Sequence, residues 1–259
     1  MRFPIWQVDA FSSRRFGGKP AAIVPLEQWL SDETLLAIAA ENNLSETAYL
    51  VREADAYQIR WFTPTEEVPL CGHATLASAW VVFERLEPGC ERVVFRSKSG
   101  ELPVTREGER LVLDFPIGAL EPAADVNALT AALGAQPREL FSGFQWLARF
   151  DSEADVRALV PDMVALVKSG IHGVIATAPG HDCDFVSRFF APAAGVPEDP
   201  VTGSAHTRLT PFWAARLGKN SLHARQVSAR GGELWCTLQG GRVRMAGHAC
   251  LYLEGSIEV

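Results

Sequence analysis

Cysteine is scarce and scattered in this sequence. The five cysteines are odd in number and include no Cys-x-x-Cys pair, so neither a disulfide framework nor a zinc knuckle is indicated. Five histidines show no metal-ligand spacing and are expected to be surface or core residues: His172, His181, His206, His223 and His248. The sequence therefore predicts no metal site, and its cysteine usage fits a reducing cytoplasm.

Blocks of Lys and Arg are also missing, and the formal net charge is −7. Nucleic acid and anionic membrane surfaces are therefore poor candidates for partners. The N-terminal residues Met1–Ile5 lead directly into a strand-like run without a signal-peptide core, and no apolar run approaches transmembrane length. We expect a cytoplasmic protein that binds neither nucleic acid nor membrane.

A repeated phrase is the main positive signal. Residues Arg60–Pro64 and Arg188–Pro192 share the pattern Arg-aromatic-Phe-x-Pro, and each is followed by a Val-Pro pair and then by a glycine. The separation is 128 positions from Arg60 to Arg188 but 131 from Gly72 to Gly203, so the second copy carries a three-residue insertion, which we place beside Asp199. An offset close to half of 259 residues predicts two copies of one domain.

Many short strand signals surround one helix in each half. This pattern favours an α+β fold of two pseudo-symmetric domains, each a curled mixed sheet around a central helix, over the βαβ rhythm of a dinucleotide-binding fold. The stretch 116–122 is the best linker candidate, which gives domains of residues 1–118 and 119–259.

Three further helix signals are specific enough to test. Ser31 is expected to cap a helix over residues 32–42, because acidic residues follow it and apolar residues recur at helical spacing. One helix is expected over residues 153–169. In the helix that begins at Gly203, Pro211 either kinks the helix or opens a new one.

The two helices that begin at Gly72 and Gly203 are candidates for an anion site. The first turn of a helix presents unpaired N–H groups and the positive end of the helix dipole, which suit a carboxylate or a phosphate. Two such ends would hold a small anionic substrate. The alternative is that both are ordinary capped helices.

Three ionisable residues near these turns are candidate catalytic groups. Glu46 lies in a polar loop as a general base would, and partial desolvation is expected to raise its pKa toward the working range. His73 is in a first helical turn, where a neutral imidazole can donate or relay a proton. Asp199 could orient His73 or a substrate amine. The alternatives are a solvated Glu46, a His73 that only caps backbone, and an Asp199 that is an N-cap.

Cys71 precedes Gly-His at a helix N-terminus, a position that lowers the pKa of a thiol. Alone it could act as a nucleophile or a thiol base. A racemase with two thiol bases would need a second cysteine at the matching position, which is Thr202, and no cysteine occurs between Cys183 and Cys236. The thiol pair is therefore missing.

These residues resemble the signatures of a known family. Leu44–Ala48, Gly72–Thr75 and Asp199–Ala205 are similar to the three signatures of the PhzF-like isomerases of phenazine biosynthesis, and Phe16–Val24 is similar to their N-terminal motif. Lys19 stands where that family usually has Asn. Further stretches that resemble the family are Gly173–Thr177 and Arg230–Gly232.

The resemblance implies the diaminopimelate-epimerase-like fold, with the active site in a cleft between the two halves and a last strand that crosses back to the first half. It implies that Glu46 is the acid/base and that Gly72, His73 and Asp199 are site residues. It also implies a homodimer that works without metal or cofactor.

The leading hypothesis is a cofactor-independent isomerase in which Glu46 moves a proton between carbons of a small carboxylate-bearing substrate. His73 and Asp199 would polarise or orient that substrate, and the N–H groups of Gly72, His73, Gly203 and Ser204 would hold its carboxylate. Ser45, Lys19 and Cys71 are further candidate substrate contacts. The alternatives are a one-thiol racemase that uses Cys71 with Glu46, and a non-catalytic protein that binds small acids. The namesake phenazine reaction is only one candidate.

Overall fold

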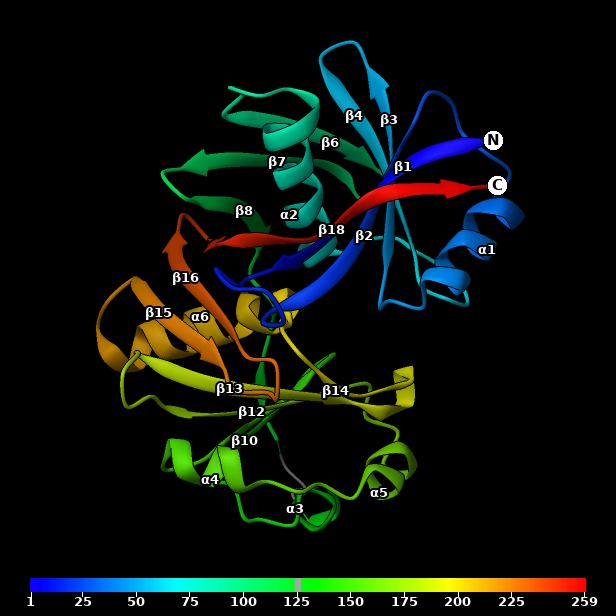
Figure 1. Cartoon of the computed structure of the whole chain (residues 1–259). Coiled ribbons are helices and arrows are strands. Elements are labelled where there is room, and N and C mark those ends of the chain that lie inside the picture. The colour runs from blue at the N-terminus through cyan, green and yellow to red at the C-terminus, as the bar shows by residue number, and fades with distance from the viewer. Residues whose placement is uncertain (124–126) are drawn as a thin grey trace. The chain divides into compact units, whose positions relative to one another are not determined.

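The computed structural model describes residues 1–123 and 127–259. Its backbone contacts divide the chain into two units (Figure 1): Met1–Asp114 with Ala246–Val259, and Phe115–Met245. The division that we predicted, residues 1–118 and 119–259, stays a prediction. None of the described helices has the length and hydrophobicity that a membrane span requires.

The first unit is a mixed sheet that surrounds one helix. Its strands are β1 (Arg2–Ala10), β2 (Lys19–Leu26), β3 (Thr47–Glu53), β4 (Ala56–Phe62), β5 (Glu67–Val68), β6 (Arg92–Ser97), β7 (Gly100–Glu107), β8 (Arg110–Pro116) and β18 (Ala249–Glu258). Its helices are α1 (Asp32–Asn42), α2 (Gly72–Val81) and the π-helical turn η1 (Val82–Leu86). The C-terminal strand β18 runs antiparallel to β1, as Figure 1 shows in red and blue.

Helix α2 is the central helix of this unit because it has no polar face to turn toward water. Small and apolar residues run all round it, a pattern that is typical of a fully buried helix. Most of its residues are buried: His73, Ala74, Thr75, Leu76, Ala77, Ser78, Ala79 and Val81. Helix α1 has the predicted bounds, and the Ser31 side chain accepts a hydrogen bond from the Thr34 N–H at 3.3 Å, which confirms the predicted cap.

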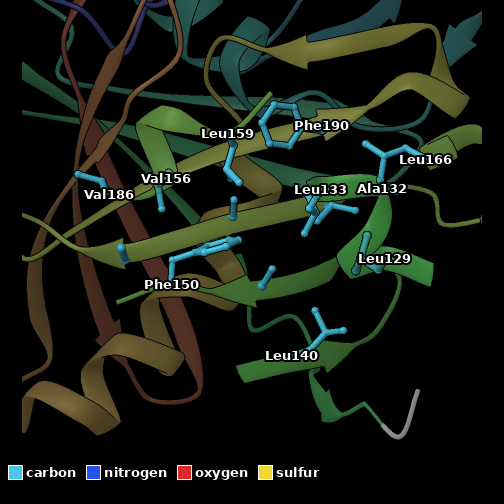
Figure 2. Close-up of a cluster of buried hydrophobic side chains, with 14 residues drawn as sticks. Leu129, Ala132, Leu133, Leu140, Phe150, Val156, Leu159, Leu166, Val186 and Phe190 are labelled. Atoms are coloured by element: carbon cyan, nitrogen blue, oxygen red, sulfur yellow. The ribbon is translucent and has the colours of Figure 1, made fainter. Parts of the chain in front are cut away.

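The second unit has a similar plan. Its strands are β9 (Glu121–Pro122), β10 (Glu139–Ser142), β11 (Trp146–Arg149), β12 (Val174–Pro179), β13 (Phe185–Ala191), β14 (Val196–Asp199), β15 (Ser221–Gln226), β16 (Gly232–Gln239) and β17 (Arg242–Gly247). Its helices are α3 (Asn127–Leu133), α4 (Glu153–Ala158), α5 (Met163–Lys168), the 3₁₀ turn η2 (Pro192–Ala194) and α6 (Gly203–Leu217). A separate core between its sheet and the short helices includes Phe190, Leu159 and Leu133 (Figure 2).

One correction and one resolved alternative concern these helices. The helix expected over residues 153–169 is two helices, because Pro161 disfavours the helical conformation at the residue before it and the chain is already extended at Leu159, where ψ is 129°. Pro211 lies inside a continuous α6, so it does not open a new helix. Its ring nitrogen cannot donate to the carbonyl of Thr207, and that carbonyl accepts the Gly118 N–H at 3.2 Å instead.

The strand topology repeats. In the first unit β2 is parallel to β3, β3 antiparallel to β4, β4 antiparallel to β5 and parallel to β6, and β6 antiparallel to β7. In the second unit, β11, β12, β13, β14, β15 and β16 pair in the same sequence and with the same directions. Helices α2 and α6 occupy the same place in this order. Each unit is therefore one copy of the predicted α+β repeat.

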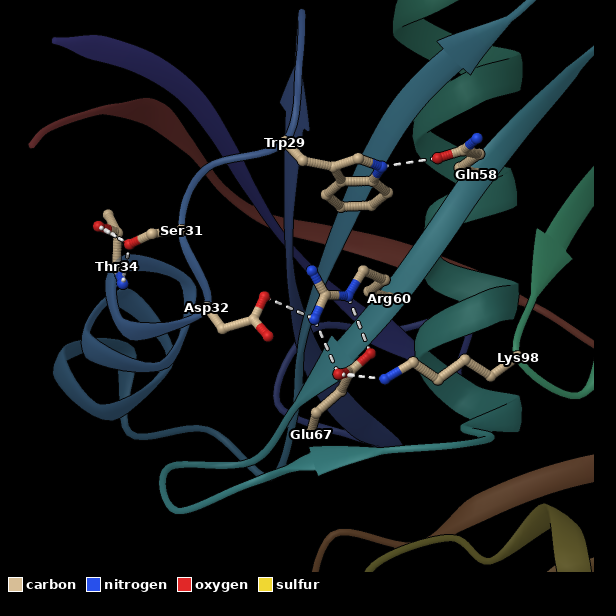
Figure 3. Close-up of polar contacts among 8 residues, drawn as sticks. All are labelled: Trp29, Ser31, Asp32, Thr34, Gln58, Arg60, Glu67 and Lys98. Atoms are coloured by element: carbon tan, nitrogen blue, oxygen red, sulfur yellow. Dashed lines mark hydrogen bonds and ion pairs between the residues drawn. The ribbon is translucent and has the colours of Figure 1, made fainter.

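A bidentate ion pair repeats as well. Arg60 on β4 donates to both carboxylate oxygens of Glu67 on β5, at 2.9 and 2.8 Å, within the network that Figure 3 shows. Arg188 on β13 donates to both oxygens of Glu198 on β14, at 2.7 and 2.8 Å. Each pair links the two strands of a hairpin. The first residue of the central helix follows five positions after the glutamate.

This pair relocates the insertion. Glu67 and Glu198 are 131 positions apart, as are Gly72 and Gly203. The strand pairing agrees. In the first copy Val68 pairs with Trp61, and in the second Asp199 pairs with Phe189, so Val68 and Asp199 are equivalent. The extra residues of the second copy therefore lie before β14, at the η2 turn. Our placement of the insertion beside Asp199 was wrong, because the Val-Pro pairs that suggested it are not equivalent in the two copies.

Candidate active site

Three predicted site residues meet in the first unit. Lys19 begins β2, Glu46 directly precedes β3, and these two strands are parallel neighbours. His73 is the second residue of α2, and its Nε2 lies 3.2 Å from Glu46 Oε2. Lys19 Nζ lies 3.7 Å from the same carboxylate oxygen. The Glu46 side chain is only 16 % exposed, so this carboxylate is held in a largely dry site between an imidazole and an ammonium.

The surroundings of Glu46 change the expectation for its acidity. Burial by itself would raise the pKa of Glu46, but the charge of His73 and its hydrogen bond, followed by Lys19, lower the pKa to about 2. At the acidic pH at which a carboxyl group titrates, an imidazole normally carries a positive charge. The predicted rise toward the working range was therefore wrong for the protein without substrate, because two basic partners outweigh desolvation.

Cys71 extends this group on the other side of the imidazole. Its Sγ lies 3.3 Å from His73 Nδ1, and both side chains are buried. One ligand atom from each of Glu46, Cys71 and His73 lies within 4.8 Å of the others. The ring presents Nε2 to the carboxylate and Nδ1 to the sulfur. A single metal ion can take only one ring nitrogen, so binding an ion here would break one of these two contacts of the ring.

Asp199 belongs to a second buried polar group, in the other unit. The Thr202 hydroxyl donates to Asp199 Oδ2 at 2.6 Å. The Gln226 amide accepts the Thr202 N–H at 2.8 Å and donates to the Asp199 carbonyl at 2.7 Å. Gln226 is 1 % exposed and ends β15. Sequence reasoning missed it, because a Gln at the end of a strand, far along the chain from Asp199, carries no local signal.

Gly203 and Ser204 form the first turn of α6 in this unit, and Ser204 is exposed. The Ser204 hydroxyl accepts a hydrogen bond at 2.9 Å from the amide of Gln145, which is itself 4 % exposed. Because its lone pair is engaged in this way, the hydroxyl hydrogen can be donated to a ligand. Gln145 also gave no sequence signal. In the first unit, Gly72 begins α2 and Ser45 is half-buried beside Glu46.

Matching the two copies shows that their chemistry differs. Cys71 and Thr202 are both N-cap residues, and each backbone carbonyl meets a side chain four residues later: Thr75 Oγ1 at 2.6 Å in one copy and His206 Nδ1 at 2.8 Å in the other. The same offset matches His73 with Ser204.

The match for Glu46 comes from the ladders. Ala48 pairs with Trp61 in the first copy, and Ile175 pairs with Phe189 in the second, so Ala48 and Ile175 are equivalent. Two residues earlier in each copy, Glu46 is therefore equivalent to Gly173. A Cβ atom at Gly173 would lie 2.5 Å from the Phe189 ring, so a side chain there would require that ring to move. The carboxylate, the imidazole and the thiol are therefore all on the first copy, where the second has a glycine and two hydroxyl groups.

Comparison with known proteins decides the family. Residues 8–255 match the PhzC-PhzF family, described as phenazine biosynthesis-like protein. The chain belongs to this family. It is 55 % identical over 260 residues, the whole of both chains, to a Pseudomonas aeruginosa protein named an uncharacterized isomerase. The expected enzyme class, isomerase, is confirmed by such relatives.

Solved structures agree. A PhzF-family phenazine biosynthesis protein from Enterococcus faecalis has a TM-score of 0.98 and 43 % identity, with all of both chains covered. A hydroxyproline epimerase from Agrobacterium vitis has a TM-score of 0.60 and 11 % identity, and covers 99 % of this chain and 92 % of that one. At that identity the likeness concerns the fold alone. The predicted fold class is confirmed.

Proposed function

We propose that this PhzC-PhzF isomerase moves a proton between two carbons of a small carboxylate-bearing substrate, without a cofactor, and that Glu46 carries the proton. The observation that supports this most is the buried Glu46–His73 contact at 3.2 Å, present in one copy of the repeat and replaced by Gly173 in the other. Since the two copies cannot each supply a base of this kind, a single base that takes and returns the proton fits the chain better than a pair of opposed bases.

Lys19 gives substrate binding one way to make Glu46, whose pKa is about 2, more basic. A substrate carboxylate that binds the Lys19 ammonium would compete with Glu46 for that charge. The pKa of Glu46 would then rise when substrate is bound, since an opposite charge has moved away from it. The ion pair would thus keep Glu46 ionised in the free enzyme and make it more basic in the complex.

The remaining site residues have proposed roles of binding and orientation. The first-turn N–H groups of α2 are directed along the helix axis toward its N-terminal end, where the dipole favours a carboxylate. Asp199, Gly203 and Ser204 keep their predicted roles in substrate binding as proposals. Homodimer formation and a cytoplasmic location also remain proposals that follow from the family resemblance and the composition.

A second candidate is a one-thiol racemase, which the 3.3 Å contact between Cys71 Sγ and His73 Nδ1 favours. In that reaction Cys71 itself would take or give the proton at an amino-acid α-carbon. Inversion at that carbon, lost when Cys71 is replaced by serine, would identify it.

Solvent-deuterium exchange tests the leading proposal. Wild-type protein and Glu46→Gln would be incubated in D2O with a panel of small amino, hydroxy and unsaturated cyclic carboxylic acids, and the products examined by NMR. We expect deuterium at one carbon with the wild type and a loss of at least about 10²-fold in rate with Glu46→Gln. Glu41→Gln is the matched control, because Glu41 is an exposed carboxylate on α1. Equal exchange in Glu46→Gln would refute the assignment of the base.

A further inference from the structure

The N-cap residues of the two central helices do not cap their helices. Cys71 (φ −145°, ψ 105°) and Thr202 (φ −117°, ψ 98°) have the extended backbone of an N-cap residue, yet neither side chain accepts a hydrogen bond from the helix that it begins. Thr at this position ordinarily accepts an N–H from the first turn. In both copies the side chain is therefore used for another contact.

In the second unit, the donors and acceptors around Thr202 show which contact its side chain makes. Gln226 Nε2 donates to Thr202 Oγ1 at 3.2 Å, and an amide nitrogen can only donate. One lone pair of the hydroxyl is therefore occupied, and the hydroxyl hydrogen points to Asp199 Oδ2, 2.6 Å away. Thr202 thus directs its hydroxyl hydrogen at one oxygen of Asp199, Oδ2.

In the first unit the same reasoning fixes one end of the imidazole. Glu46 is ionised at neutral pH, because its pKa is about 2, and a carboxylate only accepts. The 3.2 Å between His73 Nε2 and Glu46 Oε2 is an ion-pair distance, and a ring that carries its hydrogen on Nε2 directs it toward this carboxylate. If the imidazole is neutral with its hydrogen on Nε2, Nδ1 is an acceptor, and the Cys71 thiol, 3.3 Å away, is placed to donate to it.

We propose that Cys71 is a positioning residue, matched in the repeat by Thr202: its thiol donates to His73 Nδ1 and holds a neutral imidazole with its N–H directed at Glu46. Two charged groups of the described residues lie close to this imidazole: Glu46 before β3 contacts it, and Lys19 on β2 contacts Glu46. The negative charge of Glu46 and the positive charge of Lys19 already balance. A thiolate–imidazolium pair would add two charges to a site whose side chains are almost entirely buried, and desolvation opposes that.

This role rests on the proposed function but does not need a substrate for its test. The ring nitrogens of His73 would be followed by long-range ¹H–¹⁵N NMR in the wild type, Cys71→Ala and Cys71→Ser, with His73→Gln to assign the signals. In the wild type we expect hydrogen on Nε2 and none on Nδ1 at neutral pH. Cys71→Ala removes the donor to Nδ1, so the midpoint at which His73 gains a second proton should move to higher pH. Cys71→Ser, which keeps a donor, should restore the wild-type behaviour.

The direction of the change decides the matter. A midpoint that moves to lower pH in Cys71→Ala would mean that a thiolate stabilised an imidazolium, and no change would mean that the thiol does not act on the ring; either result overturns the proposal. Cys90→Ser, at a half-exposed cysteine, is the control for removal of a thiol. In the exchange assay, Cys71→Ala should lower kcat by about 10-fold or more through misorientation of His73, and Cys71→Ser should recover it. Loss of exchange in Cys71→Ser, with the NMR behaviour intact, would instead make the thiol the base.

Discussion

Replacement of Lys19 by methionine tests how the charges around Glu46 are balanced. Methionine keeps the length and the apolar stem of lysine but removes the ammonium, which lies 3.7 Å from Glu46 Oε2. At an effective dielectric constant of about 20, two charges at this distance interact by about 4 kcal/mol. A neighbouring opposite charge typically lowers the pKa of a carboxyl group by about 1 to 3.

The expected change is near the low end of that range, because His73 contributes more than Lys19 to the lowered pKa of Glu46. We expect the pKa to rise from about 2 to about 3 in Lys19→Met. It should stay below its ordinary value of 4.5, since His73 is still in place. Lys19→Asn introduces the residue that the family usually has at this position, and it should raise the pKa of Glu46 by a similar amount.

The measurement is a ¹³C NMR titration of the glutamate side-chain carboxyls, with Glu46→Gln to assign the signal. The wild-type Glu46 signal should stay that of a carboxylate down to the acid limit of the folded state, whereas the Lys19→Met signal should begin to move before that limit. Lys168→Met, which removes an exposed lysine in the other unit, controls for the loss of one positive charge. Identical titrations of Glu46 in the wild type and in both Lys19 variants would show that the ion pair with Lys19 does not lower the pKa of Glu46.

Stability should follow with a definite sign. A carboxyl whose pKa is lowered on folding stabilises the native state above its unfolded pKa and loses that contribution as pH falls through its folded pKa. For Glu46 the window runs from 4.5 to about 2, and the contribution is about 3 kcal/mol. Because the pKa in Lys19→Met is less depressed, its free energy of unfolding should fall less steeply in this window, by about 1.4 kcal/mol in total. Urea unfolding at a series of acidic pH values measures it.

Two further predictions concern the second unit. Thr202→Val removes the hydroxyl that donates to Asp199 at 2.6 Å, so it should reduce deuterium exchange by about 10-fold or more, and Thr202→Ser should restore it; equal rates in the two variants would show that the hydroxyl has no role. Glu198→Gln disrupts the bidentate pair with Arg188 and should lower the free energy of unfolding by about 1.5 to 3 kcal/mol, as urea denaturation would show. Glu67→Gln makes the equivalent change in the other copy and is the matched comparison. If both variants were as stable as the wild type, the bidentate ion pairs would not stabilise the fold.

Much of the fold could be predicted from the sequence because its signals are local. Ser31 and the acids after it predicted the start of α1, and the polar turns that begin at Gly72 and Gly203 predicted where the two central helices begin. The repeated Arg-aromatic-Phe-x-Pro phrase predicted two copies of one unit. These patterns depend on backbone propensity and on side chains a few positions apart.

Local reasoning failed where two preferences competed within a short stretch. Apolar residues at helical spacing predicted one helix across residues 153–169, but the preference of Pro161 for an extended preceding residue divides it. The recurring Val-Pro pairs likewise suggested a register that the ladder contradicts, since Asp199 matches Val68.

The sequence by itself therefore determined the family, the two-copy α+β plan and most of the residues at the candidate site, Glu46, His73, Cys71 and Asp199 among them. Only the tertiary structure decided what those residues do to one another. It brought Lys19 and His73 to the same carboxylate oxygen of Glu46, which reversed the expected direction of its pKa. It also brought Gln226 to Thr202 from a strand far along the chain. The reason is physical: the pKa and the hydrogen-bond direction of a buried group depend on the few atoms within about 4 Å of it, and folding gathers those atoms from segments that are distant in sequence.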